Sequence, residues 1–106
     1  FVEPNLEDIE LSKKIGAKMV ELHTGRYAEL AGNLADEEFE KIAKATRQAQ
    51  KLNLIVHAGH GLHYRNAKRI AKIEGMCDLN IGHSIISYAV LVGLERAVQE
   101  MKAIVT

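Results

Sequence analysis

The hydrophobic and polar positions of this 106-residue chain change several times between the spacing of a strand and the spacing of a helix. Short apolar or alternating segments predict strands, and longer segments with apolar residues every three or four positions predict helices. The expected strands cover 1–3, 18–23, 54–58 and 78–81. The expected helices run from the N-cap Asn5 to the stop at Gly16, and over about 36–52, 65–72 and 82–104, with a break at Gly93. A loop is expected from Thr24 to Asn33.

This alternation of strands and helices predicts an α/β fold with a parallel sheet, because the connections are long enough for crossovers. The crossovers are expected to be right-handed. Two architectures fit the order of elements, namely part of a (β/α)8 TIM barrel and a small open doubly wound sheet.

The two faces of the predicted strands differ, and the difference favours the barrel. In strand 18–23, Val20 and Leu22 share one face, and Glu21 and His23 share the other. The polar faces of all four strands together carry Glu3, Glu21, His23, His57 and Asn80. An open sheet would bury this face beneath a helix without partners, whereas the inside of a barrel near its catalytic end accepts such residues. A solvent-facing surface without a function is the alternative interpretation.

Composition and charge exclude several classes of protein. Fourteen basic and fourteen acidic residues give a net charge of zero, which argues against a nucleic-acid-binding protein. No apolar run approaches the roughly 20 residues that span a membrane, and no signal peptide is visible. The single cysteine, Cys77, cannot form an intrachain disulfide and is expected to be a small buried residue. We therefore expect a cytoplasmic protein with no nucleic-acid or membrane partner.

Histidine and glycine gather where the predicted strands end. Four of the five histidines and four of the eight glycines lie there, namely His23, His57, His60, His83, Gly25, Gly59, Gly61 and Gly82. Histidine exchanges protons near neutral pH, and glycine lets backbone N–H groups approach a ligand. The segment Gly59–Gly61 could present His60 to a cleft or form a simple tight turn. The segment Gly82–Ser84 could bind phosphate at a helix start, or Ser84 could merely cap the helix.

A metal site is a further possibility that the spacing raises but does not favour. His57, His60 and His63 are three residues apart. Zinc sites usually place such ligands on a helix or in a zinc loop, whereas His57 belongs to a predicted strand and His60 to a glycine turn. The sequence therefore predicts no metal and no cofactor.

Three segments of this chain form a distinctive set, and they read ELHTG-x-YA over 21–28, AGHGL-x-Y over 58–64 and LNIGH-x-II over 79–86. In the same order and with similar spacing, these segments resemble the pyridoxine 5′-phosphate synthase family of vitamin B6 biosynthesis. Residues 93–102 are also similar to the last helix of that family, so the resemblance covers essentially the whole chain.

The resemblance implies the last four βα units of a (β/α)8 barrel, and thus the C-terminal half of one domain over 1–106. It implies a synthase that condenses 1-deoxy-D-xylulose 5-phosphate with 3-amino-2-oxopropyl phosphate, giving pyridoxine 5′-phosphate, phosphate and water. In this family, the position of His60 donates a proton, that of Glu21 stabilises charge in the transition state, and those of Gly61, Gly82 and His83 bind phosphate. The family also forms homo-octamers.

The chain departs from the family pattern in two respects. His57 stands where the family is expected to have Asn, and the change could alter hydrogen bonding or charge near the site. The first four strands of the barrel, with the general-base histidine and a second catalytic glutamate, have no counterpart here. The abrupt start at Phe1 is accordingly interpreted as an entry into the fifth strand.

Three functional hypotheses follow from these features. The chain is half of a synthase that needs its N-terminal half for activity, a phosphate-binding half-barrel without turnover, or an oligomerising α/β fragment. Glu21 and the inward-facing histidines favour the first, since a simple phosphate binder does not need them.

Overall fold

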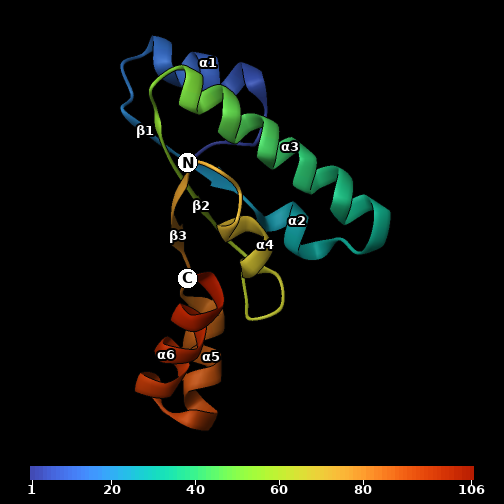
Figure 1. Ribbon diagram of the computed structural model, residues 1–106, viewed down its shortest axis with the longest axis vertical. Coiled ribbons are helices and arrows are strands. Elements are labelled where there is room, and N and C mark those ends of the chain that lie inside the picture. Colours follow the sequence, from blue (N-terminus) through green and yellow to red (C-terminus); the bar gives the residue numbers. More distant parts are fainter.

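Three parallel strands form the centre of the computed structural model, which describes residues 1–106 (Figure 1). They are β1 (Met19–His23), β2 (Ile55–Gly59) and β3 (Met76–Asn80), in the order β1-β2-β3. The register places Glu21 beside His57 and His57 beside Asp78. Two residues further along each strand, Gly59 lies between His23 and Asn80. The carboxyl ends of all three strands therefore meet at one edge.

Six helices connect and follow the strands. They are α1 (Leu6–Lys14), α2 (Gly25–Glu29), α3 (Gly32–Lys51), α4 (Ala67–Ala71), α5 (His83–Val92) and α6 (Leu94–Val105). Figure 1 shows α1 beside α3 at one end of the molecule and α5 with α6 at the other. The predicted start of α1 is confirmed, because Asn5 Oδ1 accepts a hydrogen bond of 2.8 Å from the Asp8 N–H. The predicted break at Gly93 is also confirmed, with a φ of 89° between α5 and α6.

The core lies between the apolar face of the sheet and the helices α1, α3 and α4. Its largest fully buried side chains are Ile9, Leu22, Ile42, Val56 and Ile70, with Thr24 and Thr46. On the opposite face, Glu21, His23 and His57 are only half-buried. The sequence-based assignment of one apolar and one polar face is thus confirmed. An α/β unit with parallel strands, one covered face and one open polar face agrees with half of a TIM barrel.

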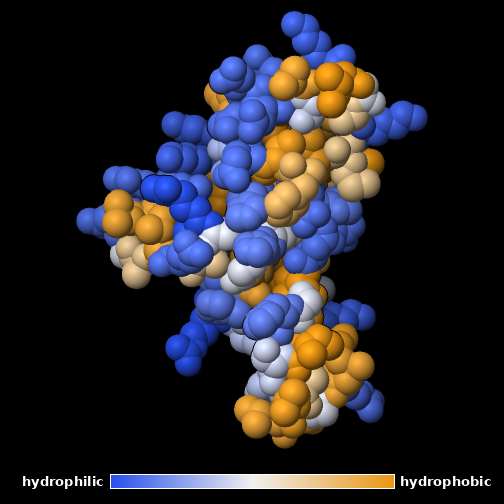
Figure 2. Space-filling view, turned by 180° about the vertical axis from the view of Figure 1, so that it is seen from behind, coloured by the Kyte–Doolittle hydropathy of each residue, from blue (hydrophilic) through white to orange (hydrophobic).

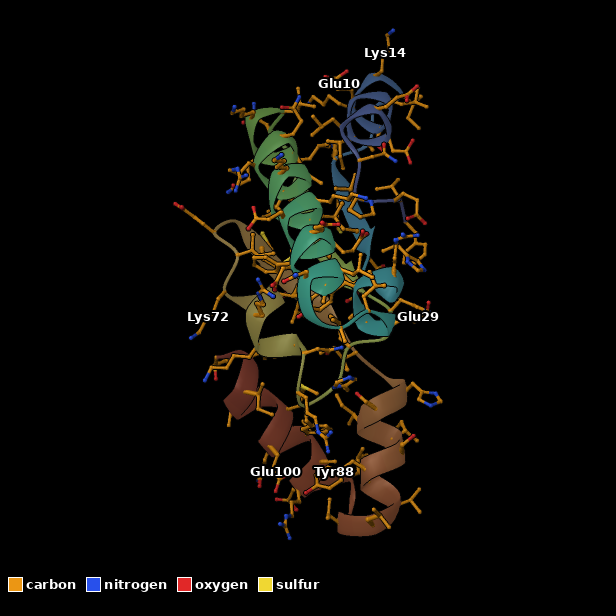
Figure 3. The ribbon with its side chains drawn as sticks, turned by 90° about the vertical axis from the view of Figure 1, so that its right-hand side faces the viewer. Glu10, Lys14, Glu29, Lys72, Tyr88 and Glu100 are labelled. Atoms are coloured by element: carbon orange, nitrogen blue, oxygen red, sulfur yellow. The ribbon has the colours of Figure 1, made fainter.

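Helices α5 and α6 form a hairpin that extends away from the sheet. Arg96 Nε donates a hydrogen bond of 2.9 Å to Glu100 Oε1, and Glu100 lies next to Tyr88 of the other helix (Figure 3). The pKa of the Glu100 carboxyl is lowered mainly by the hydrogen bond from Arg96, and a hydrogen bond from Tyr88 adds a smaller effect in the same direction. Tyr64 anchors the hairpin by donating a hydrogen bond of 2.7 Å to the Ala97 carbonyl.

Apolar side chains gather at the far end of this hairpin (Figure 2). Val90 and Leu91 of α5 are about four-fifths exposed, and Leu94 of α6 is more than half exposed. No helix of the molecule combines the length and the apolar character that crossing a membrane requires.

Three local predictions are wrong. Segment 1–3 contributes a single bridge, Val2 to Leu22, instead of a strand, and the sheet has three strands. The predicted loop from Thr24 to Asn33 contains α2 and the first turn of α3. Cys77 is exposed, because β3 is an edge strand whose faces are incompletely covered.

Candidate active site

A cavity of about 570 Å³ opens at the carboxyl ends of β1, β2 and β3. It is lined by all five residues to which the resemblance assigned a role, namely Glu21, His60, Gly61, Gly82 and His83. The other lining residues are Phe1, Leu62, His63, Asn80, Ile81 and Ser84. These residues come from every strand end of the sheet, so the fold assembles the cavity from segments that lie far apart in the sequence.

Glu21 enters the cavity from the polar face of β1. Its carboxylate lies over the Cα of Gly59 on the neighbouring strand, where an added Cβ would collide with Glu21 Oε1. The same Cβ would lie 3.0 Å from the Asn80 carbonyl oxygen. Gly59 therefore provides the space that the carboxylate occupies, a role that its position at a strand end did not reveal.

His60 follows β2 in an unusual backbone conformation. Its φ is 87°, in the left-handed region that favours glycine, and Gly61 has a φ of 75°. A non-glycine residue in this region stores strain that the surrounding structure must offset. The conformation turns the exposed His60 side chain to the cavity.

Thr24 holds the His60 turn against the end of β1. Its fully buried Oγ1 lies 2.8 Å from the Gly59 carbonyl oxygen and 2.7 Å from that of His60, and its hydroxyl donates to this pair. The Thr24 N–H also donates to the Gly59 carbonyl, at 2.9 Å. Sequence reasoning assigned Thr24 only to the end of a strand and missed this contact.

Replacing Thr24 with Val is expected to destabilise the protein by about 1–3 kcal/mol, because it removes the hydroxyl that donates to the His60 carbonyl, while the Gly59 carbonyl keeps the Thr24 N–H. Thr24→Ser is the matched control, because it retains the hydroxyl and loses only a methyl group. Urea unfolding of both variants checks this expectation. Equal stability of the Val variant and the parent protein would show that the hydroxyl does not hold the turn.

The far side of the turn is fixed by Asn66 and Tyr27. Asn66 Oδ1 accepts a hydrogen bond of 2.7 Å from the His63 N–H, and Asn66 Nδ2 donates to the Gly61 carbonyl at 3.2 Å. The Tyr27 hydroxyl donates to the Asn66 carbonyl at 3.1 Å. Burial raises the pKa of Tyr27 above its ordinary value, so the hydroxyl remains a donor well beyond neutral pH.

Helix α5 begins at the rim of the cavity without a side-chain cap. Gly82 is the N-cap residue, and no side chain accepts from the first N–H groups of the helix. Ser84 donates its hydroxyl to the Leu62 carbonyl, at 2.8 Å, so the alternative in which Ser84 caps the helix is wrong. The free N–H groups and the helix dipole together favour an anion at this position.

Two histidines near the cavity, His57 and His63, have separate polar partners. His57 Nε2 lies 3.3 Å from Asp78 Oδ2 across the sheet, and His63 Nδ1 accepts from the Arg65 N–H at 3.1 Å. No group of three or more His, Cys, Asp or Glu side chains is placed to hold a metal ion. His57 thus brings an imidazole–carboxylate pair to the polar face, next to Glu21 in the register.

Comparison with known proteins decides the family. The family model described as "Pyridoxal phosphate biosynthesis protein PdxJ" matches residues 1–106. This chain belongs to the PdxJ family. It is 50% identical over 106 residues to pyridoxine 5′-phosphate synthase of Prochlorococcus marinus (strain MIT 9312), and 52% identical over 105 residues to that of Thermodesulfovibrio yellowstonii. The chain spans 44% and 43% of the lengths of these two PdxJ relatives.

Proposed function

We propose that this chain forms the C-terminal half of the barrel of a pyridoxine 5′-phosphate synthase. The proposed reaction joins 1-deoxy-D-xylulose 5-phosphate to 3-amino-2-oxopropyl phosphate and releases pyridoxine 5′-phosphate, phosphate and water. The observation that carries the proposal is the convergence of Glu21, His60, Gly61, Gly82 and His83 on one cavity. Membership of the PdxJ family supports the same proposed reaction.

The chemistry divides between a proton-transfer side and a phosphate side of the cavity. Ring closure between an amine, ketones and a sugar phosphate needs repeated proton transfers and losses of water, for which imidazole and carboxylate groups are suited. We assign proton donation to His60 and stabilisation of developing positive charge to Glu21. Their exposure to the cavity and the glycines around them leave room for a substrate.

Phosphate binding is assigned to Gly61, Gly82 and His83. The support is the uncapped start of α5 at Gly82 and His83, because backbone N–H groups there can donate to phosphate oxygens. Gly61, on the opposite loop, lines the same cavity. Two phosphorylated substrates need more than one such site, and the N-terminal half is expected to contribute further contacts.

The other partners belong to the same proposal. The open polar face and the two free edges of the sheet are expected to be covered by the N-terminal half of the barrel, since proteins avoid such open edges. We further propose a homo-octamer of complete chains and a cytoplasmic location. This chain alone is expected to be inactive.

The test uses a completed protein, in which this chain replaces the segment that it matches in the Prochlorococcus marinus (strain MIT 9312) relative. We expect the completed protein to form pyridoxine 5′-phosphate from the two substrates. Glu21→Gln is expected to lower turnover, and Glu10→Gln, an exposed change on α1, is the matched control. Phosphate binding without product formation by a folded completed protein would favour the phosphate-binding module, and neither binding nor product would favour an oligomerising fragment.

Replacing Gly82 with Val is expected to weaken the affinity for a phosphorylated substrate. Crowding of the strand-to-helix turn is not the cause, because an added Cβ at Gly82 has no neighbour within 4 Å. The expected cause is instead the loss of space for phosphate at the start of α5. Steady-state kinetics of the completed protein should show a raised KM with little change in the melting temperature. An unchanged KM would remove Gly82 from the phosphate site.

A further inference from the structure

The orientation of the His60 imidazole needs an explanation that hydrogen bonding does not supply. Neither ring nitrogen of His60 has a hydrogen-bond partner, although its carbonyl is held by Thr24. A group that transfers a proton must lie within about 2.6–3.2 Å of the atom that receives it. The ring must therefore be held by packing, with both nitrogens left free for a substrate.

The packing partner is His23, the last residue of β1. The two imidazole rings are stacked, with centroids 4.7 Å apart and planes inclined by 25°. This separation lies within the range in which aromatic rings attract one another. His23 itself lies outside the set of cavity-lining residues.

His23 is in turn fixed by its own neighbours. Its Nδ1 accepts a hydrogen bond of 3.2 Å from the Gly25 N–H, which requires that this nitrogen carry no proton. The ring of Phe1 meets it edge-on, with centroids 4.9 Å apart. The hydrogen bond sets the direction of the ring, and Phe1 adds a second aromatic contact.

Gly25 makes this stack possible. A Cβ at this position would collide with His23 Cε1 and lie 2.7 Å from His60 Cδ2. The glycine is the first residue of α2 and has an ordinary negative φ, so the turn itself does not require it. The glycine is needed because the two rings occupy the space beside it.

We propose that His23 is a positioning residue that holds the imidazole of His60 in its working orientation by stacking. The inference rests on the proposed role of His60 in proton transfer. His23 touches no substrate; it acts through the ring that it supports. The stacked face matters more than the ring nitrogens of His23, because only the face contacts His60.

Three variants of the completed protein separate stacking from hydrogen bonding. His23→Phe keeps an aromatic face and loses the acceptor for the Gly25 N–H. His23→Asn loses the aromatic face, and its side-chain oxygen can still accept from that N–H. His23→Ala loses both.

We expect the Asn and Ala variants to lose about tenfold to a hundredfold in kcat, because small misplacement of a reacting group has effects of this size. Their KM values should change little, since the phosphate contacts at Gly61, Gly82 and His83 do not depend on His23. The Phe variant should retain most of the kcat. Circular dichroism and thermal unfolding identify any variant that fails to fold, and the Phe and Asn pair decides the question without the Ala variant.

Two kinetic results would overturn the proposal. One is a kcat of the Asn variant equal to that of the unsubstituted completed protein, and the other is a Phe variant as impaired as the Asn variant. A crystal structure of each variant gives a readout independent of turnover, because the His60 ring should keep one orientation in the Phe variant and leave it in the Asn variant. If the unsubstituted completed protein shows no turnover but the two variants still differ in the orientation of the His60 ring, the proposed function is contradicted and the stacking is supported. One orientation in both variants would contradict the stacking.

Discussion

Replacing His60 with Ala or Gly is expected to remove most of the turnover of the completed protein, while the Gly variant is the more stable of the two. Loss of the proton-donating imidazole should lower kcat by about 10²–10⁴-fold in both variants. The φ of 87° at this position strains any residue that has a Cβ, and glycine adopts it freely. The Gly variant should therefore exceed the Ala variant in free energy of unfolding by about 1 kcal/mol.

The comparison between the two variants controls for the loss of the ring. Both lose the stack against His23, so only the Cβ at position 60 distinguishes them. Steady-state kinetics and urea unfolding measure the two effects separately. Unchanged turnover in either variant would remove His60 from the proton-transfer role. An Ala variant as stable as the Gly variant would show that the turn is not strained.

Replacing Gly59 with Ala is expected to lower turnover about 100-fold by displacing the carboxylate of Glu21. The added methyl group would occupy the position of Glu21 Oε1 and would lie 3.0 Å from the backbone oxygen of Asn80. The carboxylate is the part that can move, because Gly59 lies between two hydrogen-bonded strands. A shift of about 1 Å in a group that stabilises a transition state is sufficient for an effect of this size.

A double-mutant cycle with Glu21→Gln tests this cause. If Gly59→Ala acts through Glu21, the double variant should be little worse than the more impaired of the two single variants. Additive losses in kcat would show that Gly59 acts independently of the carboxylate. Thermal unfolding of the four proteins separates either result from a general loss of stability.

The α/β fold and its layers could be predicted from the sequence, because the alternation of apolar and polar residues along each strand indicates which face is buried. Val20 and Leu22 are buried while Glu21 is half-exposed, as their spacing indicated. Helix α2 was missed because its five residues are too few to show a helical period, and its stability depends on Tyr27 packing toward Phe39 of α3. The strand at 1–3 was overpredicted, since its pairing is limited to Val2.

The location of the candidate site could also be predicted from the sequence. Parallel strands bring their carboxyl ends to one edge, so Glu21, His60 and Gly82 could be expected to meet, and the cavity contains them all. The contacts that shape the site were not predictable. The stack of His23 on His60, the hydroxyl of Thr24 and the space above Gly59 depend on how β1 is registered against β2. The spacing along one segment does not contain that register.

The most direct test of the central claim is a crystal structure of the completed protein with bound pyridoxine 5′-phosphate. We expect the product in the cavity at the carboxyl ends of β1, β2 and β3, with its phosphate at the start of α5 near Gly82 and His83. Its ring should lie within reach of His60 and Glu21. Product bound elsewhere, with this cavity empty, would contradict the assignment of the cavity as the active site.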